Sequence, residues 1–389
     1  MFSDAELDIV LSPDFQKTVE ANLSRKPLEI AIDSHVDNAR LVATEVKYLQ
    51  RARKKLPSFF SARVVMHELC FEQSSSEECA WAKGLYGDSL LDLTFGLGVD
   101  SMILSKNFKK VTAVECSEVN CRIAEENLKR MGVDNLQIIH ARAEEFLEKS
   151  VETYDWILID PDRRSEGKKM VCLEDCSPNI LEIENLLRKK GRRICIKCSP
   201  LFDTKEAFRL FSDCRVEVVA VHAETKEVNI FIDGSRPRIT VRDLKYGTAE
   251  FEWPLKKRSC EITVSKACRM KYLFIPSSAV DHARVLGEIM CELNAYWEEG
   301  GIAMMDCLPE KNLPGQIYSI EEFMPFSPKK LKSVINGKTS LILLRNFDIS
   351  LSTVRKMVGS CEGEDLSFCF SRIGNNRVAF RIKKVTLQT

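Results

Sequence analysis

The chain has 389 residues, of which 44% are hydrophobic and 29% are charged. This length and composition predict two or three domains with sizeable cores and exclude a largely disordered chain. The 57 basic and 57 acidic side chains give a formal net charge of +0. No global field therefore draws the protein to nucleic acid or to an anionic membrane, and any RNA binding must come from local patches.

The cysteines and the N-terminus indicate the compartment. The chain has 15 cysteines, and its first residues are acidic where a secretion signal needs a basic start and an apolar run. We expect a cytoplasmic protein with reduced thiols and no membrane segment. Cys195 and Cys198 form a CxxC pair, but inside an expected strand, where residues three apart point to opposite faces. Buried cysteines are favoured over zinc, and no metal is expected.

The elements change character along the chain. Residues 1–80 read as a helical region: Ser12-Pro13 is a helix-start pattern, and three serines at 74–76 precede another helix. From residue 81 to 236, helical segments alternate with continuous apolar runs, which are typical of parallel strands buried on both faces. This pattern predicts an α/β fold with a Rossmann-like sheet.

After residue 236 this regular alternation ends. Residues 238–244, 249–255 and 260–264 read as strands, residues 281–297 as one amphipathic helix, and residues 365–385 as a hairpin that turns near Asn375-Asn376. The C-terminal third is therefore predicted to hold one or two small α+β domains.

Two strand ends carry the first functional signal. The first strand runs into LLDLTFGLGVDS, where Gly96 and Gly98 permit a tight turn and a close approach to a ligand. The second ends at Glu115, about twenty residues beyond the turn, where a carboxylate can accept hydrogen bonds from ribose hydroxyls. Taken alone, Glu115 reads better as a helix cap or a surface carboxylate, and a single GxG is weak evidence because many strand-to-helix turns carry glycines for packing.

Asp92, Gly96, Gly98 and Glu115, followed by Asp160-Pro161 after the fourth strand, resemble class I S-adenosylmethionine-dependent methyltransferases. The third glycine of a dehydrogenase fingerprint is absent. The resemblance spans about residues 70–235 and implies S-adenosylmethionine as the cofactor. The cofactor-binding residues that it implies are Gln73, Asp92, Thr94, Gly96, Gly98, Glu115, Cys116, Arg142, Ala143 and Asp160.

Two further stretches bear on the cofactor. FEQSSSEECA resembles the segment before the fold in guanine-N2 methyltransferases of the trimethylguanosine-synthase kind, which adds Ser75 and Glu77 as candidates; an ordinary capping box is the alternative. The family usually has an aspartate after the third strand that binds the adenine amine. Here Arg142, Ala143 and Glu144 follow that strand, so a backbone group or Glu144 would take that role.

The fourth strand ends in Asp160-Pro161-Asp162-Arg163. Methyltransferases that act on exocyclic amines usually have Asn/Asp/Ser-Pro-Pro-aromatic here, so the second proline and the aromatic are missing. The resemblance implies that Asp160 accepts a hydrogen bond from the target amine while Pro161 keeps the backbone extended. Asp162 is a third catalytic candidate, and Arg163 and Arg164 are candidates to stack on a base or hold a phosphate. Alternatively, Asp162 and Arg163 pair with each other or cap the next helix.

The C-terminal region resembles the THUMP-like domain, with a preceding ferredoxin-like domain, of bacterial proteins in this methyltransferase group. The matching pieces are KYLFIPSSAV, EEFMPFSPKKLK, RNFDISLSTVRKMVG and RVAFRIKK. The match implies an RNA substrate, with Lys329, Lys330, Arg345 and Arg355 as candidate contacts; solvated helix ends are the alternative. The expected domains are a helical region (1–80), a methyltransferase domain (81–236), a ferredoxin-like domain (237–318) and a THUMP-like domain (319–389).

The resulting hypothesis is a methyltransferase that modifies an exocyclic or ring nitrogen of a base in structured RNA, such as rRNA or tRNA. One alternative is an RNA-binding protein that keeps the fold but has lost catalysis, which the altered Asp-Pro-Asp-Arg motif favours. Another is a methyltransferase for a small molecule or a protein. The sequence does not specify the RNA, the base, the atom or the oligomeric state.

Overall fold

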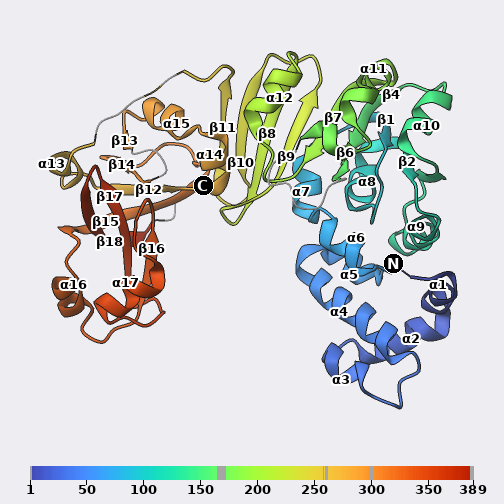
Figure 1. The fold of residues 1–389 in the computed structure, drawn as a ribbon, viewed down its shortest axis with the longest axis horizontal. Coiled ribbons are helices and arrows are strands. Elements are labelled where there is room, and N and C mark those ends of the chain that lie inside the picture. The colour runs from blue at the N-terminus through green and yellow to red at the C-terminus, as the bar shows by residue number, and fades with distance from the viewer. Residues whose placement is uncertain (1, 164–171, 257, 259–261, 298–300, 386–389) are drawn as a thin grey trace. The chain divides into compact units, whose positions relative to one another are not determined.

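The computed structural model describes residues 2–163, 172–256, 258, 262–297 and 301–385. The chain divides into two compact units (Figure 1). Unit 1 comprises Met1–Phe202 and Asn229–Ser235, and unit 2 comprises Asp203–Val228 and Arg236–Thr389. Within the described residues, every helix is too short or too polar to cross a bilayer.

The N-terminal part of unit 1 is helical, as predicted. Ser12 caps one helix by accepting the Phe15 N–H, with Pro13 at its first position, and Ser76 caps another. Pro57, which follows the basic end of the longest helix, opens the next helix at once. The helices are α1 (Asp4–Leu11), α2 (Pro13–Asn22), α3 (Pro27–Ala31), α4 (Ala39–Lys55), α5 (Pro57–Ala62), α6 (Glu68–Gln73) and α7 (Glu77–Ala82).

A parallel sheet forms the rest of unit 1, which confirms the α/β class. Its strands lie in the order β7-β4-β1-β2-β3, with the Asn229–Ile232 part of β9 beside β7. Leu90 of β1 faces Val111 of β2 on one side and Trp156 of β4 on the other. The strands are β1 (Gly87–Asp92), β2 (Phe108–Glu115), β3 (Leu136–His140), β4 (Tyr154–Ile159) and β7 (Gly191–Cys198). The connections contain α8 (Val99–Leu104), a 3-10 turn (Ser105–Asn107), α9 (Glu118–Met131), α10 (Ala143–Lys149), β5 (Asp162–Arg163), a 3-10 turn (Leu173–Asp175), β6 (Cys176–Ser177) and α11 (Ile180–Lys190).

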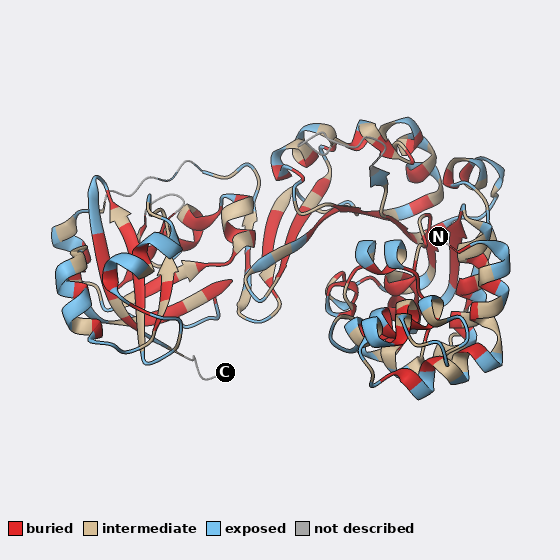
Figure 2. Ribbon diagram, turned by 60° about the horizontal axis from the view of Figure 1, so that its bottom comes forward, coloured by how far each residue is buried: buried red, intermediate tan, exposed pale blue. Residues whose placement is uncertain are grey.

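The N-terminal helices and the sheet share one core. Phe2, Val46 and Phe59 belong to the same buried cluster as Leu90 and Trp156, and the ribbon in Figure 2 is red where residues of these elements are buried. The buried side chain of Asn127, on α9, also accepts the N–H of Val65 and donates to its carbonyl, both at 2.8 Å. Residues 1–80 therefore pack as part of unit 1.

Unit 2 begins with α12 (Thr204–Leu210) and a group of strands. Strand β10 (Arg238–Asp243) pairs in parallel with β8 (Cys214–Val221) and antiparallel with β11 (Gly247–Glu252). Strand β9 (Glu224–Ile232) is divided between the units, with Glu224–Val228 in unit 2. The predicted boundary at 236–237 thus falls between strands β9 and β10, and β10 and β11 pair with β8 and with each other instead of with the later strands.

Within the described residues, seven strands form the second sheet, in the order β13-β14-β12-β15-β18-β17-β16. The predicted boundary at 318–319 falls inside β15, which pairs with β12 on one side and β18 on the other. The strands are β12 (Tyr272–Pro276), β13 (Tyr296–Trp297), β14 (Ala303–Met305), β15 (Gly315–Pro325), β16 (Ser340–Leu344), β17 (Leu366–Ile373) and β18 (Asn376–Lys384). The helices are α13 (Val264–Ala267), α14 (Ser278–Ala283), α15 (Leu286–Glu292), α16 (Pro328–Ile335) and α17 (Leu351–Val358).

Local predictions in unit 2 had mixed outcomes. The hairpin is confirmed, since Ile373 of β17 faces Asn376 of β18. The single helix over 281–297 is wrong: Arg284 has φ 57°, which ends α14, and α15 starts two residues later. The strand over 260–264 is also wrong where it is described, because Thr263 caps α13. Residues 260 and 261 lie outside the described residues.

Candidate active site

A cavity of about 300 Å³ opens at the carboxyl ends of the unit 1 strands. Gly96, Glu115 and Asp160, which follow or end three different strands, all line it. Parallel strands place their carboxyl ends along one edge of a sheet, where α/β folds bind ligands. Of the predicted residues, those that line the cavity are Gln73, Ser75, Asp92, Thr94, Gly96, Gly98, Glu115, Cys116, Arg142, Ala143, Glu144, Asp160 and Asp162.

The glycine turn has the left-handed conformation that its sequence suggested. Gly96 has φ 56° and Gly98 has φ 77°. A Cβ at Gly98 would lie 2.1 Å from Cζ of Phe95, whereas a Cβ at Gly96 would have nothing within 4 Å. Gly98 is therefore required for packing of the turn, and Gly96 opens onto free space in the cavity wall.

Glu115 holds this turn in place. Its Oε2 accepts the Gly96 N–H at 2.9 Å and its Oε1 accepts the Ser117 N–H at 2.8 Å, although the side chain is buried. A carboxylate has about four lone-pair positions. Glu115 thus combines the capping role that the sequence left open with capacity to accept two ribose hydroxyls.

A chain of hydrogen bonds connects the ends of β1 and β4. Asp92 accepts the Thr94 N–H at 2.9 Å and the hydroxyl of Ser101. The Thr94 hydroxyl in turn accepts the N–H of Asp160 at 2.7 Å. Burial raises the pKa of Asp92 to about 7. The backbone at Asp160 is therefore fixed by the same strand end that carries the glycine turn.

Asp160 forms a close ion pair with Lys197, which the sequence analysis did not single out. Ile159 of β4 pairs with Ile196 of β7. The next residues along the two strands, Asp160 and Lys197, therefore lie side by side. The Lys197 side chain is 10% exposed and that of Asp160 is 39% exposed. Desolvation raises the pKa of Asp160, and the Lys197 ammonium opposes that rise. A lysine at the end of the apolar run RRICIKCS was the signal that could have indicated this residue.

A second ion pair lies in the wall of the cavity. Lys83, with a fully buried side chain, contacts Asp100 at 2.7 Å, and the Ser75 hydroxyl donates to Asp100 at 2.8 Å. Burial alone would raise the pKa of Asp100, but the ammonium groups of Lys83 and Lys197 lower it below its usual range. Ser75 is thus at the cavity as the motif suggested, whereas Lys83 and Asp100 were missed.

Glu77 has a different role from the one that the motif suggested. Its carboxylate accepts the Ser58 N–H at 2.8 Å and the Ser58 hydroxyl at 2.7 Å. Ser58 lies in the first turn of α5, so Glu77 caps that helix from a distance. It does not line the cavity.

His67, Cys70 and Asn120 form another part of the wall and were also missed. The His67 Nε2 lies 3.0 Å from Oδ1 of Asn120 and 2.9 Å from the Cys70 sulfur. Burial lowers the pKa of His67 and raises the pKa of Cys70 to about 12. The pair is therefore a neutral thiol beside a neutral imidazole.

The segment after β4 is only partly described. Asp162 lines the cavity, Pro161 does not, and Arg163 pairs through its backbone with Cys176 of β6. Arg164 lies outside the described residues. After β3, Arg142 is the N-cap residue of α10 and contacts Glu144 at 3.6 Å.

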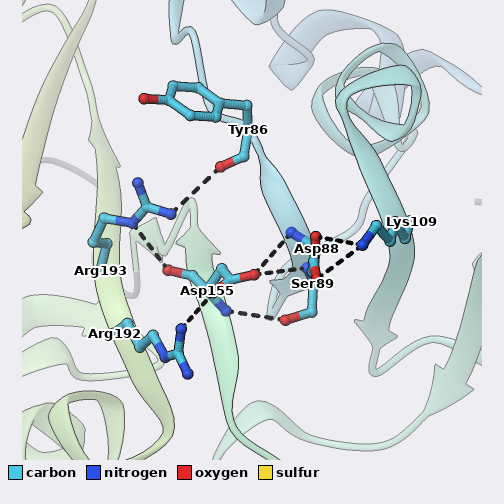
Figure 3. Close-up of polar contacts among 7 residues, drawn as sticks. All are labelled: Tyr86, Asp88, Ser89, Lys109, Asp155, Arg192 and Arg193. Atoms are coloured by element: carbon cyan, nitrogen blue, oxygen red, sulfur yellow. Dashed lines mark hydrogen bonds and ion pairs between the residues drawn. The ribbon is translucent and has the colours of Figure 1, made fainter.

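The basic run at 188–193 lies at the amino-terminal edge of the sheet, away from the cavity. Figure 3 shows Arg192 and Arg193 converging on Asp155 at the start of β4. Asp155 also accepts the N–H groups of Asp88 and Ser89 at 2.8 and 3.1 Å. These arginines therefore clamp strand ends together.

In unit 2 the four predicted RNA contacts differ in availability. Lys329 and Lys330 are exposed in the first turn of α16. Arg345 forms an ion pair with Asp281, and Arg355 donates to the Ser340 carbonyl at 3.2 Å. The two lysines are therefore better candidates for RNA contacts than the two arginines.

Two segments of the chain match families of known proteins. Residues 73–221 match the family tRNA (Uracil-5-)-methyltransferase, and residues 315–384 match the family THUMP domain-like. An uncharacterized S-adenosylmethionine-dependent methyltransferase of Mycobacterium tuberculosis (strain CDC 1551 / Oshkosh) is 22% identical over 307 residues, which are 75% of this chain and 80% of that protein. A tRNA/tmRNA (uracil-C(5))-methyltransferase of Actinobacillus pleuropneumoniae serotype 5b (strain L20) is 42% identical over 159 residues, which are 36% of this chain and 40% of that protein.

A solved structure has the same fold over the whole chain. It is a crystal structure from Porphyromonas gingivalis W83, described as a candidate methyltransferase, with a TM-score of 0.84 and 21% identity. It covers 99% of this chain and 100% of that one.

The fold, the cavity and these matches define an S-adenosylmethionine-dependent methyltransferase. More particularly, one segment of the chain matches the tRNA (Uracil-5-)-methyltransferase family and a later segment matches the THUMP domain-like family. S-adenosylmethionine is the methyl donor that the name of the Mycobacterium relative gives.

The residues of the cavity fit this cofactor. The cavity lining contains Lys197 and Arg142 but more carboxylates than cations, namely those of Asp92, Asp100, Glu115, Glu144, Asp160 and Asp162. This excess suits a cation that carries a sulfonium and an ammonium group. Glu115 would hold the ribose, and the turn at Gly96 leaves room beside it. The cofactor supplies an electrophilic methyl group when it is bound.

Proposed function

We propose that the chain transfers this methyl group to a nitrogen of a base in structured RNA, such as rRNA or tRNA. The observation that carries the proposal is Asp160, a carboxylate at the same cavity as Glu115, with its N–H held by Thr94 and its side chain held by Lys197. The match of residues 315–384 to the THUMP-like family supports an RNA substrate. So does the name of the Actinobacillus relative, a tRNA/tmRNA methyltransferase.

Asp160 has the properties that methyl transfer to nitrogen requires. A carboxylate accepts a hydrogen bond from the target N–H and so turns the nitrogen lone pair toward the methyl group. Such catalysis is largely positioning, which contributes at most roughly 7–11 kcal/mol. Asp162 lines the same cavity and offers a second acceptor.

Carbon 5 of uracil is a second candidate target, because residues 73–221 match a family of uracil-5 methyltransferases. This carbon must first be activated, for example by addition of a thiolate to the neighbouring ring carbon. Cys70 and Cys116 line the cavity, and Cys198 follows Lys197. Burial raises the pKa of Cys70 to about 12 and that of Cys198 well above its usual range. Burial also raises the pKa of Cys116. Protonated thiols are poor nucleophiles, which favours nitrogen as the target.

A labelling experiment tests the proposal. Total RNA from a strain that lacks the protein would be incubated with tritiated S-adenosylmethionine and wild type, Asp160→Ala, or Asp134→Ala; the Asp134 carboxylate is exposed and distant in sequence. We expect Asp134→Ala to match wild type. Asp160→Ala removes the hydrogen-bond acceptor and should lose at least about 100-fold in turnover, roughly 2.7 kcal/mol, with unchanged affinity for S-adenosylhomocysteine. Wild-type protein that binds the cofactor and labels no RNA would refute the proposal.

The labelled nucleoside distinguishes the two targets. Digestion and mass spectrometry should give an N-methylated base. A labelled 5-methyluridine, together with a covalent complex on RNA that contains 5-fluorouracil, would instead establish the second candidate. The variants Cys70→Ala, Cys116→Ala and Cys198→Ala would then identify the thiol.

A further inference from the structure

Lys197 differs from the basic residues on the outside of unit 1. Its side chain is only 10% exposed, and its ammonium lies in the cavity wall against Oδ2 of Asp160. An ammonium at this depth has lost most of its hydration, and attraction to nearby carboxylates is weak compensation for its burial. Such a pair contributes little to stability, which suggests a role in the site.

The backbone makes the pair rigid at both ends. The parallel register of β4 and β7, with Ile159 facing Ile196, puts Asp160 and Lys197 side by side. The N–H of Asp160 is held by the Thr94 hydroxyl at 2.7 Å. Because Lys197 engages Oδ2, the torsion of the carboxylate is fixed, and Oδ1 has a defined direction. A carboxylate that turns freely would present its lone pairs to the substrate in many directions.

Asp160 lies among several other carboxylates, so a nearby cation is needed to keep it ionised. The groups that face it or act on it are Lys197 on β7, Lys83 beside α8, the carboxylates of Asp92, Asp100, Asp162 and Glu115, and the thiol of Cys198. Several anions near one another favour protonation of at least one of them. A protonated Asp160 would present an O–H donor to the target nitrogen and would be a weaker acceptor for the hydrogen bond from its N–H.

We propose that Lys197 is a positioning residue, which keeps the Asp160 carboxylate ionised and oriented so that it accepts a hydrogen bond from the methyl-acceptor nitrogen. The proposal rests on the proposed function, since it deepens the role of Asp160. Lys197 acts through Asp160 and touches neither the methyl donor nor the base in this scheme.

The pH profile of turnover distinguishes this role from a structural one. In Lys197→Met the carboxylate loses its cation, so the pKa of Asp160 rises. The acid limb of the profile should then move up by at least about one pH unit, and turnover near neutral pH should fall by about 10-fold or more. Lys197→Arg keeps the charge and should bring the limb back toward wild type. Lys129→Met, which removes an exposed lysine of α9, is the matched control and should leave the profile unchanged.

A second measurement needs no RNA. Full-length protein labelled with ¹³Cγ-aspartate and bound to S-adenosylhomocysteine would be titrated by NMR, with the Asp160 signal assigned from Asp160→Asn. An upward shift of the Asp160 pKa in Lys197→Met supports the proposal. An identical titration in the two proteins overturns it, as does a shifted pKa with an unchanged pH profile. A wild-type protein that labels no RNA overturns the proposed function instead, whatever the titration shows.

Discussion

Substitution of the two turn glycines by alanine should separate packing of the turn from binding of the cofactor. Gly96 and Gly98 both have positive φ, so each alanine variant carries a left-handed residue, which costs roughly 1–2 kcal/mol. At Gly98 the new methyl carbon would also lie 2.1 to 2.7 Å from three ring atoms of Phe95. Phe95 is 4% exposed and has no room to swing out, and overpacking of this kind costs about 1–3 kcal/mol more.

The two variants should therefore differ in how much stability they lose and in their effect on cofactor affinity. Gly98→Ala should lose about 2–5 kcal/mol of stability, and Gly96→Ala only about 1–2 kcal/mol. Gly96 faces open space in the cavity wall, so its methyl group should intrude on the cofactor. We expect its affinity for S-adenosylhomocysteine to fall at least about tenfold, or about 1.4 kcal/mol.

Hydrogen exchange measured by mass spectrometry on peptides from β1 and α8 gives the stability of this region without contributions from unit 2. Isothermal titration calorimetry gives the cofactor affinity. Equal losses of stability in the two variants would refute the packing argument at Phe95. An unchanged affinity in Gly96→Ala would show that Gly96 does not face the bound cofactor.

Three further predictions follow from other contacts. Glu77→Gln weakens the cap on α5 and should cost about 1 kcal/mol in urea unfolding while cofactor affinity stays unchanged; a loss of affinity would return Glu77 to the site. Burial raises the pKa of Glu45 to about 8 from an ordinary value of 4.5, so this side chain opposes folding increasingly as pH rises between these values. Glu45→Gln should therefore gain more stability at pH 8 than at pH 5, and a pH-independent difference would contradict the buried neutral carboxyl. Lys329→Ala with Lys330→Ala should lower RNA affinity and reduce its salt slope by about two; an unchanged slope in fluorescence anisotropy would remove these lysines from the RNA surface.

The sequence was most informative where local chemistry and fold agree. Continuous apolar runs predicted the strands of unit 1. The glycines of the first turn predicted the edge of the sheet at which a ligand binds, because the backbone conformation of a glycine turn is set locally. Gly96, Glu115 and Asp160 then meet at one cavity, since parallel strands end on the same edge.

Features that depend on pairing between distant segments were not predictable. The ion pair of Lys197 with Asp160 follows from the register of two strands that are 31 residues or more apart in the chain. The end of α14 at Arg284 follows from a left-handed residue that no glycine or proline announces. Likewise, no composition change marks strands β10 and β11 as partners of β8.

The position of α6 limits how far the chain can be shortened from its N-terminus. Residues 67–75 supply one side of the chamber in which the methyl donor would sit, although they precede the first strand. A fragment trimmed to begin at Gly87 would lack that side, and it would also expose the apolar surface that the N-terminal helices cover. A fragment that keeps the whole cavity must therefore begin at or before His67, upstream of the first strand.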